Sequence, residues 1–178
     1  MQNNKTVTIF LIKFFGVYAL LFLLYSVYLK NNQVLTGVFS CAPITKTVAK
    51  QSQFVLNVFG YNSKIQQHPE EVSMLLMVNE KYVARIIEGC NSISIIILFI
   101  SFIIAFAGRL KDTILFILLG SAIIYSVNII RIALIAIALY KFPQYQYTLH
   151  IIIFPAIIYG MTFLLWVVWV RKFAKNKR

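Results

Sequence analysis

Three residues of the chain have side chains that could act together in covalent chemistry, although each lies in or beside a strongly apolar stretch. They are Cys90, Arg131 and His150. A cysteine attacks as its thiolate, which a nearby cation favours, and a histidine can take up the thiol proton and return a proton to a leaving amine. An arginine is always charged and stabilises the oxyanion of a tetrahedral intermediate. This combination predicts acyl transfer through a thioester.

Taken singly, each residue also has a structural interpretation. A cysteine is often only a small buried side chain, and Arg131 could pair with Asn128, three residues earlier on the same helical face. A histidine at the edge of an apolar run is commonly solvated. Yet a charge near the bilayer centre costs about 2.5 to 3.5 kcal/mol, which favours a function for Arg131. The alternative to an enzyme is a non-enzymatic scaffold or carrier subunit in which Arg131 binds an anionic ligand or lipid.

The composition argues against a soluble globular enzyme. Of the 178 residues, 60% are hydrophobic and 12% are charged, whereas a soluble domain has about 25% charged residues. Apolar runs predict about four transmembrane helices, over residues 10–29, 88–107, 113–140 and 150–170. We therefore expect an all-α integral membrane protein, a single membrane domain over residues 1–178, with a short exterior helix and β-hairpin.

Basic residues predict the orientation of these spans. The short turn after the second run carries Arg109 and Lys111, and Trp166 and Trp169 close the fourth run as an aromatic belt at the membrane interface. The cations at the end of the chain are Arg171, Lys172, Lys175, Lys177 and Arg178. We expect both termini and the turn in the cytoplasm, which places residues 31–87 and the loop 141–148 outside.

Helix geometry brings the three chemical residues to a similar depth. At 1.5 Å per residue, Cys90 and Arg131 each lie about 27 Å from the cytoplasmic turn that their spans share. His150 lies about 31 Å from the C-terminal cations by the same rise. The thiol, the guanidinium and the imidazole are therefore expected to converge near the outer membrane face.

The exterior segment contains two predicted elements. Apolar residues at helical spacing, Val38, Ile44, Val48, Val55, Val58 and Phe59, predict an amphipathic helix. This helix should end at Gly60-Tyr61-Asn62. Residues 72–78 and 82–88 flank Asn79-Glu80-Lys81 and predict a hairpin that leads directly into the second span.

The motifs around these residues resemble those of the exosortase and archaeosortase family. They are Glu88-Gly89-Cys90-Asn91-Ser92-Ile93, then Asn128-Ile129-Ile130-Arg131, then His150, each at a different span. The resemblance extends from about Leu56 to Phe163 and is greatest to the compact exosortase F type. One departure is that the family commonly has Ser-Gly after the cysteine, where this chain has Asn91-Ser92.

The resemblance implies a membrane-embedded cysteine protease or transpeptidase in the bacterial inner membrane, with its active site facing the periplasm. Such enzymes cleave exported proteins at a C-terminal signal of short motif, hydrophobic helix and basic tail, and pass the product to a surface anchor. Carried over to this chain, Cys90 is the nucleophile, Arg131 the stabilising cation and His150 the acid and base. The implied partners are exported proteins, membrane lipid and an unknown anchor acceptor, with no nucleic acid.

Other polar residues have supporting or structural interpretations. Asn128, Glu88 and Asn91 are expected to support the site or bind substrate. Glu88 could orient His150 or Arg131, although a carboxylate near the surface at the end of a strand is the simpler interpretation. A disulfide between Cys41 and Cys90 is an alternative that would silence the nucleophile. The sequence has no metal-ligand spacing or phosphate-binding loop, and we expect no cofactor.

Overall fold

The computed structural model describes residues 2–106 and 108–172, without the side chains of residues 2–4, 150 and 154. Its elements in chain order are α1 (Gln2–Asn32), α2 (Pro43–Val58), β1 (Ser63–Gln67), β2 (Ser73–Val78), β3 (Lys81–Ile87), α3 (Ile93–Ala105), α4 (Leu110–Lys141), α5 (Gln146–Thr148) and α6 (Phe154–Lys172). A 3₁₀ turn, Glu88–Asn91, joins β3 to α3, and a π-helical turn, Leu149–Ile153, joins α5 to α6.

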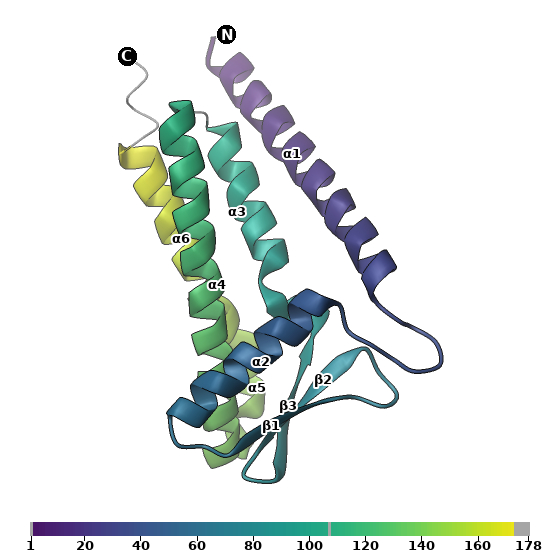
Figure 1. The fold of residues 1–178 in the computed structure, drawn as a ribbon. Helices are drawn as coiled ribbons and strands as arrows, with labels where there is room; N and C mark the ends of the chain where they lie inside the picture. Colours follow the sequence, from purple (N-terminus) through teal and green to yellow (C-terminus); the bar gives the residue numbers. More distant parts are fainter. Residues whose placement is uncertain (1, 107, 173–178) are drawn as a thin grey trace.

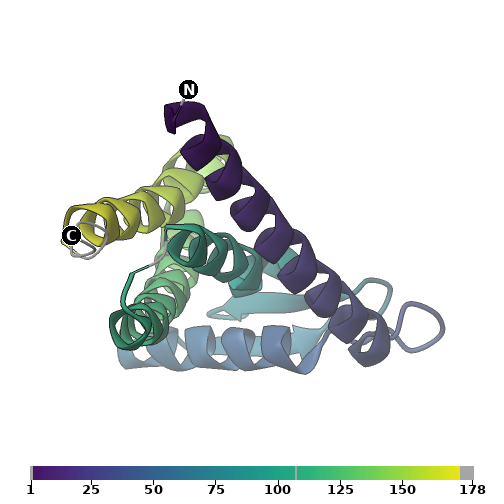
Figure 2. The ribbon, with the colours of Figure 1, turned by 90° about the horizontal axis from the view of Figure 1, so that it is seen from above.

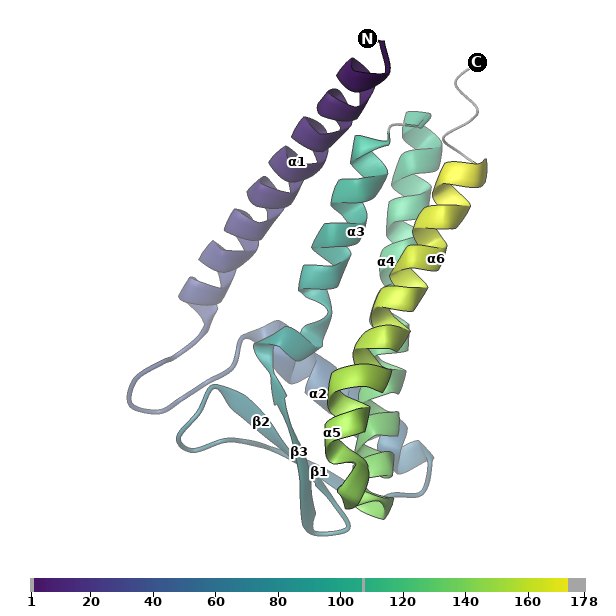
Figure 3. The ribbon, with the colours of Figure 1, turned by 180° about the vertical axis from the view of Figure 1, so that it is seen from behind.

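The long helices run side by side, and the sheet lies at one end of them (Figures 1 and 3). The α3–α4 turn lies at the end where α1 begins and α6 finishes, and α2 and the three strands lie at the opposite end. Seen from above, α1 lies beside α3 on the side of the bundle away from α4 (Figure 2). The α3–α4 turn, the start of α1 and the end of α6 therefore share one end of the molecule, and their orientation in a membrane stays a prediction from the charge pattern. Lys175, Lys177 and Arg178 lie outside the described residues.

Three segments of the described chain are long and apolar enough to cross a membrane: Lys5–Asn32, Leu110–Lys141 and Pro143–Lys172. The second predicted span, residues 88–107, differs from the expectation, because its helix α3 has only 13 residues. That length is about 20 Å, less than the hydrocarbon thickness of about 30 Å. The shortening occurs at Ser92, whose left-handed backbone (φ +63°) separates α3 from the 3₁₀ turn. Ala107, the predicted end of this span, lies outside the described residues.

The exterior segment forms a three-stranded antiparallel sheet in the order β1-β2-β3. The predicted hairpin is present as β2 and β3, and its two turn residues, Asn79 and Glu80, both have positive φ, as a tight hairpin turn requires. The all-α expectation is wrong in one respect, because β1 adds a third strand. Sequence patterning missed β1 since its five residues, Ser63 to Gln67, include only one aliphatic side chain.

The exterior helix is shorter than the predicted one, and its buried face matches the predicted face only in part. It begins at Pro43 and ends before Gly60, whose φ of +84° agrees with the predicted stop. Its buried residues are Thr45, Val48, Ala49, Ser52 and Leu56. Val38, Val58 and Phe59, which were expected on the apolar face, are 86%, 69% and 60% exposed. Of the predicted apolar residues, Val48 is fully buried and Val55 packs against the core, and the buried face also includes the small polar residues Thr45 and Ser52, which an apolar pattern does not count.

The buried side chains form two clusters. One joins α2, the sheet and α4 at the exterior end, and the other joins α3, α4 and α6 within the bundle. Trp169 belongs to the second cluster, is fully buried and packs against Phe116. Trp166 stacks on Phe102 with ring centroids 4.2 Å apart. The predicted aromatic belt is therefore wrong for Trp169, which is part of the helix packing.

Candidate functional site

Cys90 lies at the junction of the sheet and the helical bundle. Strand β3 ends at Ile87, and the 3₁₀ turn that follows places Cys90 on the wall of a cavity of about 620 Å³. This volume lies in the range of small-ligand pockets. The cavity is lined by Leu76, Tyr82, Val83, Ala84, Arg85, Ile86, Ile87, Gly89, Cys90, Arg131, Ile132, Ile135, Leu139, Pro143, Gln146 and Pro155.

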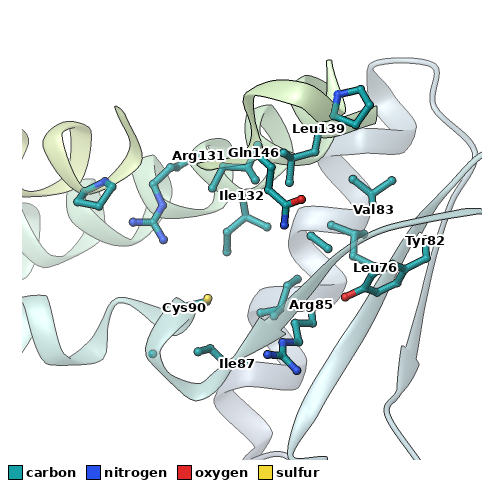
Figure 4. A pocket seen from close by; sticks show the side chains of 16 residues that line it. Leu76, Tyr82, Val83, Arg85, Ile87, Cys90, Arg131, Ile132, Leu139 and Gln146 are labelled. Atoms are coloured by element: carbon teal, nitrogen blue, oxygen red, sulfur yellow. The ribbon is translucent and has the colours of Figure 1, made fainter. Parts of the chain in front are cut away.

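Arg131 faces the same cavity from α4. The Cys90 sulfur and the Arg131 guanidinium point toward a common space from opposite sides (Figure 4). Arg131 lies within electrostatic range of the Cys90 thiol and of Tyr159. Its Nε is buried and, within the described part of the chain, has no hydrogen-bond partner. Because unpaired buried donors are rare, this donor is available to an acceptor that enters the cavity.

The backbone of His150 lies in the π-helical turn Leu149–Ile153, and its side chain is outside the described residues. Gln146 and Pro155, which flank this turn on either side, both line the cavity. The structure thus brings Cys90 and Arg131 to one cavity, and the residues Gln146 and Pro155 on either side of the His150 turn line the same cavity. The imidazole remains an expectation from the sequence.

Asn128 holds the backbone of the turn that contains Cys90. Its amide nitrogen donates to the Cys90 carbonyl at 2.7 Å, and the side chain is 1% exposed. Because α4 also carries Arg131 one helical turn further on, one rigid helix positions both the Cys90 backbone and the guanidinium. Asn128 itself does not line the cavity.

A second set of hydrogen bonds holds the turn from the other side. Glu88 accepts hydrogen bonds from the Ala42 backbone N–H at 2.7 Å and from the Thr45 hydroxyl. Asn91 donates to the Thr45 hydroxyl at 3.1 Å and to the Tyr25 hydroxyl at 2.7 Å. The two residues that flank Gly89-Cys90 are thereby tied to α1 and to the start of α2.

The Glu88 contacts correct one expectation. Its carboxylate was considered as a group that orients Arg131 or His150, or as a simple carboxylate near the surface. In the structure its described partners lie at the N-terminus of α2, where a negative charge is favoured by the helix dipole. Glu88 is thus a support for the turn, and Arg131 is not among its partners.

The two cysteines have different environments. Both are free thiols, so the alternative of a Cys41–Cys90 disulfide is not what the structure contains. Cys41 is 1% exposed, and burial, followed by the nearby Glu88 charge, raises the pKa of its thiol. Cys90 is partly exposed on the cavity wall.

Sequence reasoning missed several residues of the site. Tyr82 and Arg85 from β3 and Gln146 from α5 line the cavity. Arg85 also pairs with Glu71 at 2.5 Å on the exposed side of the sheet. The predicted hairpin pointed to the region of β3, but no pattern identified Thr45 or Tyr25, which reach the site only through tertiary contacts. No metal-binding group of His, Cys, Asp or Glu is found among the described residues.

Comparison with known families places these features in context. The model of the transmembrane exosortase family matches residues 9–171, nearly the whole chain. Comparison with curated proteins and with solved structures finds no match. The family implies a membrane protease or transpeptidase that acts on exported proteins bearing sorting signals, and the long apolar helices fit a multi-pass membrane protein. With a family match over this length, the chain belongs to the transmembrane exosortases.

Proposed function

We propose that this protein is a cysteine transpeptidase that cleaves C-terminal sorting signals of exported proteins at the outer face of the membrane. The observation that carries the proposal is the shared cavity of Cys90 and Arg131 in a chain of the exosortase family. A thiol and a guanidinium whose Nε has no hydrogen-bond partner among the described residues lie on facing walls, and acyl transfer requires such a nucleophile and such a donor.

The reaction proceeds in two halves. The Cys90 thiolate adds to the carbonyl carbon of the scissile peptide bond, and the negative charge of the tetrahedral intermediate develops on its oxygen. Arg131 donates hydrogen bonds to that oxygen. The C–N bond then breaks, the leaving amine takes a proton from His150, and a thioester remains on Cys90. Water or an amine acceptor attacks the thioester and regenerates the thiol.

Orientation in the membrane follows from charge and shape together. The α3–α4 turn carries Arg109 and Lys111, and it lies at the end of the molecule where α1 begins and α6 finishes. We propose that this end is cytoplasmic. The cavity and the sheet then face the periplasm, where exported substrates and the acceptor are available.

The test is mass spectrometry of surface proteins from cells that carry wild-type protein, Cys90→Ala or Cys90→Ser. We expect a set of proteins to lose C-terminal processing in the Cys90→Ala cells, and the cleavage site and attached group to be visible in the wild-type cells. Unchanged processing in the Cys90→Ala cells would exclude the enzyme.

The non-enzymatic alternative gives a different pattern. A scaffold or carrier that binds an anionic ligand through Arg131 tolerates Cys90→Ser and fails with Arg131→Gln. The transpeptidase loses processing in both variants, because the serine hydroxyl is not ionised at neutral pH and the neutral amide lacks the guanidinium charge.

A further inference from the structure

Strand β3 borders the cavity in an unusual way. Six consecutive residues, Tyr82 to Ile87, line it. Successive side chains of a strand point to opposite faces of a sheet, so a cavity over one face would be lined by every second residue. Lining by every residue means that the cavity runs along the edge of the strand, beside its backbone.

The edge of β3 has no neighbouring strand in the described part of the chain, since the sheet order is β1-β2-β3. The hydrogen bonds at the two ends of the β1–β2 ladder are Asn79 N–H to the Asn62 carbonyl (2.8 Å) and His68 N–H to the Ser73 carbonyl (2.9 Å). Hydrogen-bonded pairs alternate along an antiparallel ladder, so Leu75 also bonds to β1.

This alternation fixes the direction of the β3 backbone. Arg85 is paired with Leu75, and Ile87 with Ser73. Since Leu75 bonds to β1 and the Ser73 carbonyl accepts from the His68 N–H, Arg85 and Ile87 direct their N–H and C=O groups away from β2, toward the open edge. An edge of unpaired backbone groups is a template for one more strand.

The open edge leads to the nucleophile. Gly89 and Cys90 follow β3 within three residues, and all of these positions line one cavity. From Tyr82 to Ile87 the strand extends about 20 Å. The opposite wall is one side of α4, with Arg131, Ile135 and Leu139 at intervals of four residues. A chain laid along β3 therefore passes between backbone hydrogen-bonding groups and a mainly apolar helix.

We propose that the substrate segment next to the scissile bond binds as an added β-strand on the open edge of β3, which carries the scissile carbonyl to Cys90 and Arg131. This inference rests on the proposed function and specifies the conformation of the substrate. The backbone of β3 supplies hydrogen bonds that do not depend on substrate sequence, and side chains facing α4 supply the selectivity.

The first experiment removes a single edge donor. A tagged exported protein whose processing depends on Cys90 is expressed together with an enzyme variant, either Arg85→Pro or Arg85→Ala. Both variants lose the guanidinium, but only the proline variant also lacks the backbone N–H. Proline is tolerated at this position because the N–H of residue 85 faces outward from the edge of the sheet. We expect processing by Arg85→Pro to be at least tenfold slower than by Arg85→Ala.

A matched pair on the other edge of the sheet controls for damage to the fold. Ile65 in β1 is paired with Leu76, by the same alternation directs its N–H away from β2, and does not line the cavity. We expect Ile65→Pro and Ile65→Ala to process the substrate within threefold of each other. Equal rates for Arg85→Pro and Arg85→Ala would overturn the proposal.

A cross-linking experiment covers the case in which Arg85→Pro fails to fold. Single cysteines are placed along the tagged substrate and paired with Tyr82→Cys in an enzyme that also carries Cys41→Ala and Cys90→Ala. An added strand gives disulfide yields that alternate with a period of two residues along the substrate. A helical period, or no cross-link to position 82 while the substrate still copurifies, overturns strand addition.

Failure of the two proposals can be distinguished. If Cys90→Ala leaves processing intact, the transpeptidase itself is excluded. Cys90→Ala could instead stop processing while Arg85→Pro and Arg85→Ala process at equal rates and the cross-links lack a period of two residues. In that case the transpeptidase stands and only strand addition is excluded.

Discussion

Ser92 has a backbone conformation that is unfavourable for a residue with a side chain. Its φ of +63° lies in the left-handed region, which costs a residue with a Cβ about 1 to 2 kcal/mol. It occupies the place where exosortases commonly have glycine, and its hydroxyl donates to the Asn91 carbonyl at 2.6 Å. A glycine at this position therefore has a physical explanation, because the residue between the Cys90 turn and α3 must adopt the left-handed backbone conformation.

The stability of Ser92 variants is predicted to depend on how readily the new residue adopts the left-handed backbone conformation. Ser92→Gly should raise or preserve the thermal unfolding temperature of the purified protein, because glycine enters the left-handed region without steric cost. Ser92→Val should lower the free energy of unfolding by about 1 to 3 kcal/mol, since a β-branched residue is disfavoured there. A Ser92→Val protein as stable as Ser92→Gly would show that the turn does not hold this conformation.

The two thiols should differ in reactivity, because only Cys41 is fully buried. At pH 7 a small maleimide should label Cys90 and leave Cys41 unmodified, because Cys41 is buried and its raised pKa keeps the thiol protonated. Burial disfavours the Cys41 thiolate in the folded protein and so raises the pKa of this thiol above its value in the unfolded chain. The stability contributed by the protonated thiol is present at neutral pH, and the free energy of unfolding falls as the pH rises above the ordinary thiol value of about 9. We expect Cys41 labelling to increase only in alkaline solution, as folding weakens.

Mass spectrometry of the solubilised protein measures both sites, and Cys90→Ala is the control for Cys90 labelling. Rapid modification of Cys41 at pH 7 in folded protein would contradict its buried position. In intact cells, labelling of Cys90 by a membrane-impermeant reagent tests the proposed orientation separately.

At the scale of elements, α4 is the scaffold of the site. It carries Asn128 and Arg131 in its C-terminal half and packs against α3 at Gly120. A Cβ added at Gly120 would overlap the ring of Phe99, which is fully buried. The close approach of α3 and α4 therefore depends on the absence of a side chain at position 120.

Gly120→Ala is predicted to destabilise the protein by about 1 to 3 kcal/mol, because the extra methyl group overfills a packed helix interface. Phe99→Leu in the same chain should recover part of that loss by making room for the methyl group. Thermal unfolding of the two single variants and the double variant measures the coupling between the positions. Additive losses would show that the residues are not in contact.

At the scale of the whole molecule, the site is assembled from segments far apart in sequence. The Cys90 turn is bonded to α1 through Tyr25, to α2 through Thr45 and to α4 through Asn128. The cavity walls come from the sheet, the turn, α4 and the segment around α5. The N-terminal helix therefore does more than anchor the chain, because Tyr25 contributes directly to the support of the Cys90 turn.

Tyr25→Phe tests this contribution of α1. The variant keeps the ring and removes the hydroxyl that accepts from Asn91, a loss of about 0.5 to 1.5 kcal/mol. We expect substrate processing to slow about 2- to 10-fold with unchanged amounts of protein in the membrane. Tyr28→Phe is the matched control, since Tyr28 stacks on Tyr25 and makes no described hydrogen bond to the turn. Equal rates for the two variants would show that α1 does not support the site.

Much of the fold could be predicted because its causes are local. Apolar runs, which need only composition and length, located α1, α4 and α6, and the Asn79-Glu80 turn located the β2–β3 hairpin. Helix rise was enough to expect Cys90 and Arg131 at one height, and both line one cavity. The roles of Cys90, Arg131 and His150 remain predictions.

Other features depend on which surfaces meet, and no local pattern encodes that. Strand β1 has a polar sequence and exists because β2 offers it a partner. Glu88 is directed to the start of α2 because that helix presents a free backbone N–H beside Thr45.

The sequence by itself determined the basic membrane character of the chain and the residue types available for chemistry, since these follow from composition and spacing. Only the tertiary structure decided that the edge of β3, the side of α4 and the Cys90 turn enclose one cavity. The physical reason is that a cavity is defined by the packing of several elements against each other, which no single stretch of sequence contains.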